Sequence, residues 1–385
     1  MLEGLFPRKF TETDVSKFDQ KYKDGKACLF RVYMKDVRLI DEDTPIPYLA
    51  KAKCEYVRIH DSEDDEDDRY FDNGRILKCD ELECYCNEQD WSIIIKQYSF
   101  DYCILRLWTA TKSPLPQSFK DLIMHMYEQK TLLKSGDQYL YGKYKGQINA
   151  LYGMMVLNPC KVQYEYKDGK MQEKDDTIEE LIANYQKYGW LPYQWGCWTT
   201  SAARVRLQMA IDLVDPADVI YCDTDSLCCI GDYESKFEEL NKQLYDSRYT
   251  AFDTEGKEYP IGIYTIDKRC RRFKTLGAKK YAYEDLDGKL HITVSGVSKS
   301  KGPAELKKLE NFKEGFVFRD AGGMCSLYND DPPVKTVRIQ GHRLDIISNV
   351  ALFPSTYTLG LTEEYSRLLR YLMNTDIRSS LHYER

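Results

Sequence analysis

The stretch VIYCDTDSLCCI, from Val219 to Ile230, places two aspartates one residue apart between two short apolar runs. Side chains alternate along an extended backbone, so Asp223 and Asp225 can point in the same direction. Two close carboxylates repel each other, and a bound divalent cation removes that repulsion. Mg²⁺ prefers carboxylate oxygens together with substrate phosphates. The stretch therefore has two interpretations, a solvated hairpin turn and a metal site.

A D-x-D motif after an apolar strand is also found in two other classes of enzyme. Aspartate-based phosphatases use the first aspartate as a nucleophile, and nucleotide-sugar glycosyltransferases use the motif to hold a metal. Both classes need strands that alternate with helices around the site. Here the flanking residues predict an antiparallel hairpin, which counts against both alternatives.

The charge of the chain is unevenly distributed. The 385 residues carry a net charge of −7 and include 31 tyrosines. Seven acids fall in the eight positions Asp61–Asp68, a run that is typical of a solvated loop. From Arg271 to Lys308, ten Lys and Arg residues face four acids. This basic segment is compatible with a nucleic-acid partner, which the net charge alone disfavours.

The thirteen cysteines are scattered without paired spacing. The one cluster, Cys79, Cys84 and Cys86, lacks the second pair or the histidines of a zinc finger, so reduced thiols are the preferred interpretation and zinc is the alternative. The first residues do not resemble a secretory signal. No apolar run reaches the roughly 18 residues of a membrane span. We expect a cytoplasmic protein with no membrane partner.

Hydrophobic periodicity predicts an α+β chain. Strands are expected over residues 27–54, and residues 91–98 and 102–110 predict further strands or a short helix. A helical hairpin is expected after the Pro-rich stretch 113–118. Further predicted elements are a hairpin with an Asp-Gly turn over 164–176, a short helix over 177–189 and a long helix over 198–214.

A second motif is KGQINALYG, Lys145–Gly153. On a helix Lys145, Asn149 and Tyr152 share one face, because residues three and four apart are neighbours. A cation, an amide and a ring on one face can hold a triphosphate, a sugar and a base. The same pattern is also typical of an ordinary polar helix face. Lys130 and Lys134 add two cations on the preceding helix.

A third motif is KTLGAKKYAYED, Lys274–Asp285, which predicts a basic strand. In its centre, Lys279 can meet a backbone phosphate while Tyr281 packs near a base or a sugar. Exposed basic strands are common, so this motif carries weight only together with the other two.

In this order and spacing, the three motifs resemble those of family B DNA polymerases, most closely the protein-primed subgroup of bacteriophages and related mobile elements. Ala150 departs from the serine that is usual there. The resemblance implies an α+β right-hand fold, with a palm built on an antiparallel sheet, helical fingers and a thumb. The predicted boundaries are 1–54 and 191–297 for the palm, 55–113 for an insertion in it, 114–158 for the fingers, 159–190 for a second insertion and 298–385 for the thumb.

The resemblance also implies an activity, namely template-directed transfer of a nucleotidyl group from a dNTP to a primer 3′-hydroxyl or to the hydroxyl of a priming protein. Two Mg²⁺ ions, or Mn²⁺, would take part, held by Asp223 and Asp225. The nucleotide-binding residues would be Lys130, Lys134, Lys145, Asn149 and Tyr152. The residues that contact primer-template DNA would be Lys279, Tyr281, Thr200 and Arg204.

One part of the family pattern is missing, namely the D-x-x-S-L-Y-P strand with its metal-binding acid and the exonuclease domain before it. The first residues, MLEGLFPRKF, resemble the sequence that directly follows that strand. Asp36 is the nearest acid on a predicted strand and the first candidate to replace the missing one, although it lacks the S-L-Y-P context. We therefore expect a polymerase that lacks one metal ligand, one half of a split polymerase completed by a separate N-terminal chain, or a non-catalytic DNA-binding remnant. This chain alone is expected to extend a primer very poorly or not at all.

Overall fold

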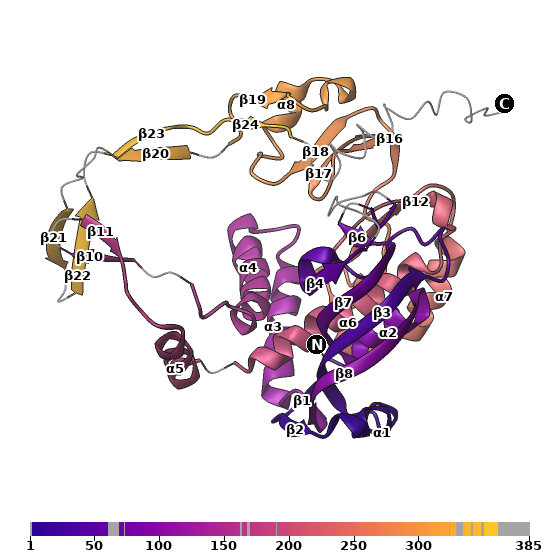
Figure 1. The fold of residues 1–385 in the computed structure, drawn as a ribbon. Coiled ribbons are helices and arrows are strands. Elements are labelled where there is room, and N and C mark those ends of the chain that lie inside the picture. Colours follow the sequence, from indigo (N-terminus) through magenta and orange to yellow (C-terminus); the bar gives the residue numbers. More distant parts are fainter. Residues whose placement is uncertain are drawn as a thin grey trace. The chain divides into compact units, whose positions relative to one another are not determined.

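The computed structural model describes residues 2–60, 69–72, 74–161, 164–167, 170–189, 191–322, 324–328, 334–339, 342–347 and 350–360 (Figure 1). The chain divides into two compact units, Met1–Leu157 with Trp190–Thr265, and Asn158–Gly189 with Ile266–Arg385. The acidic run 61–68, the Asp-Gly turn 168–169 and the last part of the predicted thumb, 361–385, lie outside the described residues.

A five-stranded antiparallel sheet with the order β2-β8-β3-β7-β4 is the centre of the first unit. Its strands are β2 (Thr11–Thr13), β3 (Ala27–Leu39), β4 (Cys54–Arg58), β7 (Lys78–Asn87) and β8 (Tyr98–Ala110). Along β3, Phe30, Val32 and Met34 are fully buried and the residues between them are not. This alternation follows from the two-residue period of a strand and places one face of the sheet on the core.

The alternation is interrupted at Asp36 by a β-bulge. The pairing of β3 with β8 shifts between Lys35 and Arg38, and Asp36 is in the left-handed region with φ 53°. The extra residue returns Val37 to the buried face of the sheet. Asp36 itself is exposed.

Helix α2 (Glu88–Gln97) packs on the core face of this sheet through Trp91 and Ile94, and α6 (Tyr193–Ile211) packs on α2. Residues 91–98, predicted as strand or helix, are therefore helical up to Gln97. The side chain of Asn87 fixes the start of α2 by accepting hydrogen bonds from the backbone N–H groups of Gln89 and Asp90, both at 3.0 Å. The long helix predicted over 198–214 is confirmed, although it begins five residues earlier.

The strand predicted through residue 54 is wrong in its second half. After Leu39 the chain forms a loop, and Lys51–Lys53 form one turn of 3₁₀-helix before β4 begins at Cys54. The backbone of this loop forms single hydrogen bonds with Gly74 and Ile76 and, within the described residues, no continuous ladder with a neighbouring strand. Apolar residues alone did not distinguish a packed loop from a strand.

The predicted helical hairpin is confirmed as α3 (Gln117–Leu132) and α4 (Gln138–Met155). The carboxylate of Asp137 accepts hydrogen bonds from the N–H groups of Tyr139 and Leu140, which fixes the start of α4. The C-terminal end of α4 packs closely on α6. A Cβ atom at Gly196 would lie 2.9 Å from the Cβ atom of Met155 and still closer to Val156.

The other elements of the first unit are short. They are α1 (Phe18–Lys23), α7 (Glu234–Leu244), β1 (Leu5–Pro7), β5 (Phe71–Asp72), β6 (Arg75–Ile76), β9 (Lys112–Pro114), β12 (Val219–Asp223), β13 (Ser226–Cys229), β14 (Thr250–Phe252) and β15 (Glu258–Pro260). Within the described part of the chain, no helix is long and apolar enough to cross a membrane.

The second unit contains a three-stranded antiparallel sheet of β16 (Cys270–Thr275), β17 (Lys280–Asp285) and β18 (Leu290–Val294). Its core includes the fully buried Leu306, Phe312 and Phe318. The predicted hairpin and short helix are confirmed as β10–β11 and α5, and α5 starts with a capping box. The remaining elements are β10 (Tyr164–Lys167), β11 (Lys170–Glu173), α5 (Ile178–Tyr188), α8 (Gly302–Leu306), β19 (Val317–Phe318), β20 (Met324–Tyr328), β21 (Val334–Ile339), β22 (His342–Ile347), β23 (Val350–Pro354) and β24 (Tyr357–Thr358).

The close approach of α4 and α6 gives a stability prediction. We expect Gly196→Ala to lower the free energy of unfolding by about 1–3 kcal/mol, because the added methyl group overlaps Met155 and Val156. Gly142→Ala is the matched control, since no atom lies within 4 Å of a Cβ there. It should stabilise the protein by up to about 1 kcal/mol through helix propensity. Urea denaturation of both variants measures the difference, and equal effects would contradict the packing argument.

Candidate active site

Asp223 and Asp225 lie at the turn of a two-stranded antiparallel hairpin, β12–β13. Asp223 pairs with Ser226, so Thr224 and Asp225 form the turn itself. The predicted hairpin is confirmed. Asp223 is half-buried and Asp225 is exposed. The Thr224 hydroxyl donates a hydrogen bond of 2.9 Å to Asp223 Oδ1, which orients the first carboxylate.

The backbone of this turn is strained. Thr224 has φ 56°, and a β-branched side chain in the left-handed region costs on the order of 1–3 kcal/mol. The turn is held by a hydrogen bond of 2.6 Å from the Asp225 N–H to the Asp223 carbonyl oxygen and by the Ser226 hydroxyl, which donates to the same oxygen. Such strain is found preferentially at functional sites, so it favours the metal-site interpretation over that of a plain turn.

Tyr264 lies near this turn, and the sequence analysis did not identify it. Burial raises the pKa of the Tyr264 hydroxyl; the positive charge of Arg206 opposes this shift and the negative charge of Asp225 adds to it. The hydroxyl donates a hydrogen bond of 2.9 Å to the Arg206 carbonyl oxygen, and the Tyr264 backbone is held by Asn241. No motif contains Tyr264, so only the fold reveals its position.

Three lysines converge on the helical hairpin. Burial lowers the pKa of Lys130, and the positive charges of Lys145 and Lys134 lower it further. Lys130 is half-buried and lies on α3, whereas Lys145 is exposed on α4. The structure therefore brings together the three cations that were predicted to bind the triphosphate. We call Lys130, Lys134 and Lys145 the lysine cluster.

The same helix also connects to α6 through Tyr152 and Thr200. Their hydroxyl oxygens are 2.5 Å apart. The Thr200 hydroxyl donates to the Gly196 carbonyl oxygen at 2.9 Å, so the shared proton between the two hydroxyls comes from Tyr152. This bond joins a predicted nucleotide-binding residue to a predicted DNA contact. Asn149 lies exposed one turn earlier on α4.

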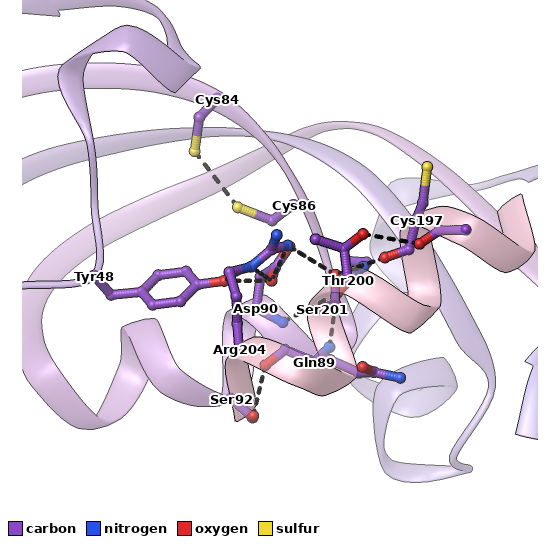
Figure 2. Close-up of polar contacts among 12 residues, drawn as sticks. Tyr48, Cys84, Cys86, Gln89, Asp90, Ser92, Cys197, Thr200, Ser201 and Arg204 are labelled. Carbon is purple, nitrogen blue, oxygen red and sulfur yellow. Dashed lines mark hydrogen bonds and ion pairs between the residues drawn. The ribbon is translucent and has the colours of Figure 1, made fainter. Parts of the chain in front are cut away.

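Arg204 is held by side chains of the first unit, as Figure 2 shows. Its Nη2 donates to Asp90 Oδ1 at 2.7 Å and its Nε donates to the Tyr48 hydroxyl oxygen at 2.7 Å. Nη2 also lies 2.9 Å from Ser201 Oγ. The Tyr48 hydroxyl donates to Asp90. Burial, and then the negative charge of Asp90, raise the pKa of the Tyr48 hydroxyl. The guanidinium group thus joins α6 to α2, and a contact of Arg204 with DNA stays a prediction.

A second carboxylate of α2 reinforces this connection. Glu88 is buried, and its Oε1 accepts a hydrogen bond of 2.8 Å from the indole N–H of Trp198 on α6. Its Oε2 accepts a hydrogen bond of 2.9 Å from the backbone N–H of Cys28 on β3. Lys112 supplies a compensating charge at 3.4 Å. One helix turn of α2 therefore anchors both α6 and the central strand.

The K-x-Y motif lies in the second unit. The single strand predicted over Lys274–Asp285 is wrong: β16 ends at Thr275, residues 276–279 form a turn, and β17 begins at Lys280. Lys279 belongs to that turn and has φ 56°. Tyr281 is on β17, and its ring stacks on that of Phe273 with 5.3 Å between the centroids. Between them, Lys280 donates to the Gly360 carbonyl oxygen at 2.8 Å. The DNA contacts of Lys279 and Tyr281 remain predictions.

Two alternative metal sites were considered, a zinc site at Cys79, Cys84 and Cys86 and a site that uses Asp36. Neither is assembled in the described ranges. There, no group of three or more His, Cys, Asp or Glu side chains is arranged to hold a metal ion. The Sγ atoms of Cys84 and Cys86 are 3.5 Å apart, and burial raises the pKa of the Cys79 thiol to about 12, which keeps it protonated. Asp36 serves the bulge of β3 and joins no such group, so its predicted substitution for the missing acid is not supported.

The connection between α2 and α6 gives a second stability prediction. The Arg204 and Asp90 side chains are 29% and 15% exposed, so Asp90→Asn leaves a mostly buried guanidinium without its counter-charge. We expect a loss of about 2–3 kcal/mol in the free energy of unfolding. Glu12→Gln breaks the pair with Arg106, whose side chains are 63% and 51% exposed, and should cost less than about 1 kcal/mol. A similar loss for both variants in urea denaturation would show that α2 and α6 do not depend on this pair.

The sequence matches no protein-family model and no curated protein. The structure is similar to that of Phi29 DNA polymerase in complex with primer-template DNA and incoming nucleotide, with a TM-score of 0.59 and 17% sequence identity over 94% of this chain and 55% of that one. For Phi29 DNA polymerase with primer-template DNA alone, the TM-score is 0.58, the identity 16% and the coverage the same. With single-stranded DNA bound, the TM-score is 0.57 at 17% identity.

At this level of identity the comparison establishes the fold and nothing finer. The chain has mixed helix and sheet content and a polymerase-like fold that is distantly similar to a protein-primed family B enzyme. It spans about 55% of the length of the Phi29 structures. The division into palm, fingers and thumb stays a prediction.

Proposed function

We propose that this chain takes part in template-directed DNA synthesis as the polymerase part of a protein-primed family B DNA polymerase. The reaction is transfer of a nucleotidyl group from a dNTP to a primer 3′-hydroxyl or to the hydroxyl of a priming protein. The observation that carries the proposal is the lysine cluster on the α3–α4 hairpin, in a chain with a polymerase-like fold.

Burial lowers the pKa of Lys130, and repulsion from Lys145 and Lys134 lowers it further, so the three ammonium groups are costly to hold together. A triphosphate removes this cost because its negative charge is compensated by all three. Asn149 and Tyr152 follow Lys145 on the same face of α4 and can meet the sugar and the base. A helix that presents cations, an amide and a ring in this order suits a dNTP better than an inorganic anion.

The turn of β12–β13 supplies the carboxylates. Asp223 and Asp225 fit a hard divalent cation, Mg²⁺ or Mn²⁺, that takes its other ligands from substrate phosphates and water. When bound, the cation neutralises phosphate charge at the site of transfer. The chain's own groups bind and orient the substrate: Thr224 orients Asp223, and the lysine cluster holds the triphosphate.

A second candidate function is DNA binding without catalysis. It is favoured by the same turn, because within the described residues no third ligand joins Asp223 and Asp225. A separate chain with a D-x-x-S-L-Y-P strand would supply that ligand in a split polymerase. Loss of a comparable electrostatic group costs about 10²–10³ in rate.

We predict that Lys130→Met and Lys145→Met each weaken binding of dTTP with Mg²⁺ by about tenfold to a hundredfold, because each removes one charge-assisted contact to phosphate. Lys143→Met on the exposed surface of α4 is the control and should bind as the original chain does. Titration calorimetry at low salt measures all three. Equal affinity of the three variants would contradict the nucleotide site.

The test of the proposed function is primer extension with Mg²⁺ and dNTPs, with and without a polymerase fragment that carries a D-x-x-S-L-Y-P strand. We expect weak extension by this chain, an increase with the fragment, and loss of both in Asp225→Asn, with Glu238→Gln on α7 as the control. The affinity for primer-template DNA should fall with salt by about 0.9 log unit per log unit for each phosphate contacted.

The outcomes of this assay separate the candidates. Binding of primer-template DNA without extension in either mixture would favour the non-catalytic function. A chain that binds neither primer-template DNA nor dTTP would contradict both. Extension that survives Asp225→Asn would show that the turn of β12–β13 is not the metal site.

A further inference from the structure

We propose that Tyr259, on the β14–β15 hairpin, is a positioning residue that holds Lys134 in the lysine cluster. The inference rests on the nucleotide-binding part of the proposed function. Each lysine of the cluster lies near a tyrosine ring. Lys130 Nζ is 4.4 Å from the ring centroid of Tyr127 and Lys145 Nζ is 6.0 Å from that of Tyr141. Lys134 Nζ is 4.9 Å from the ring centroid of Tyr259.

Lys134 differs from the other two lysines in how it is supported. Lys130 and Lys145 lie within α3 and α4, and their tyrosines precede them by one helix turn. Lys134 follows the end of α3 at Leu132, and its side chain is exposed. A long exposed side chain beyond a helix end retains most of its rotamer freedom. The Tyr259 ring, from a distant part of the chain, restricts that freedom through a cation–π contact.

The hairpin that carries Tyr259 is well fixed. Asp253 Oδ1 accepts hydrogen bonds of 2.9 Å from the N–H groups of Glu255 and Lys257, and Gly256 takes the positive φ of 80° that the turn requires. A hydrogen bond from Tyr259 is among the causes that lower the pKa of Asp253, after those to the backbone of Lys257 and Glu255. The ring therefore has a defined place before any ligand binds.

The open end of the hairpin is also anchored to α3 and α4. Tyr249 and Ile261 flank it and are joined by a backbone hydrogen bond of 2.9 Å. Both residues pack on the core cluster that contains Ile123, Met126 and Leu151 of the two helices. Within the hairpin, Ala251 pairs with Tyr259 on the opposite strand and is buried. The hairpin and the lysine cluster thus belong to one packed assembly.

The experiment is a double-mutant cycle on binding of dTTP with Mg²⁺ and of tripolyphosphate, measured by calorimetry at low salt. We expect Tyr259→Met to weaken binding of both probes about two- to fivefold, which is the range of an exposed cation–π contact. Tyr259→Phe keeps the ring but loses its hydrogen bond to Asp253, so it should weaken binding less than Tyr259→Met does. In a Lys134→Met background, Tyr259→Met should have no further effect.

A second measurement does not depend on nucleotide binding. The rate at which a small acylating reagent modifies Lys134, followed by mass spectrometry, should rise in Tyr259→Met and rise less in Tyr259→Phe, which keeps the ring. Tyr245→Leu, a change of an exposed tyrosine outside the hairpin, is the control and should alter neither measurement. Tyr259→Leu repeats the test if Tyr259→Met lowers the melting temperature.

The two measurements separate failure of the inference from failure of the proposed function. If the original chain binds no dTTP but Tyr259→Met still speeds the modification of Lys134, the placement of Lys134 by Tyr259 stands and the proposed function fails. If the original chain binds dTTP and Lys134→Met weakens it, equal loss from Tyr259→Met in both backgrounds overturns the inference. An unchanged modification rate in Tyr259→Met also overturns it.

Discussion

The structure of the first unit depends on two carboxylates at the start of α2. Glu88 and Asp90 are buried or nearly so, and a buried charge is tolerated only when it is paired and hydrogen-bonded. Their partners are Trp198 and Arg204 on α6 and the backbone of β3. Since α6 leads to β12 and also carries Thr200, these bonds determine where the aspartate turn and the Tyr152 contact lie relative to the sheet.

The sequence predicted the elements whose signals are local. The helices α3 to α6 follow from apolar spacing and helix-start residues, and the β12–β13 hairpin follows from two apolar runs around a polar turn. The loop over 40–50 was misjudged because its apolar residues pack without forming a ladder. Asp36 was considered as a replacement metal ligand on a strand, because no residue next to it in the sequence indicates the bulge that it occupies.

The candidate site was predictable only in part, for the same reason. Spacing on α4 indicated that Lys145, Asn149 and Tyr152 share a face, and the structure brings Lys130 and Lys134 to Lys145. Tyr259 lies against Lys134 and Asp90 binds Arg204, and both are contacts between residues far apart in the chain. The charge of Asp225 likewise acts on Tyr264 from a distant part of the sequence. No periodicity records such pairs. The net charge of −7 was equally uninformative, because a sum over the whole chain does not show that Lys130, Lys134 and Lys145 lie together on one helical hairpin.

The close contact at Gly196 restricts how the helical hairpin can move. Met155 and Val156 lie against Gly196 with no room for a methyl group, and Tyr152 is bonded to Thr200 one turn further along α6. Tight packing transmits displacement instead of absorbing it. The last turn of α4 and the first half of α6 therefore form one rigid body. A movement of α3 and α4 relative to α6 therefore requires a bend in α4 on the N-terminal side of Tyr152. Such a bend would move Lys145 relative to the turn of β12–β13.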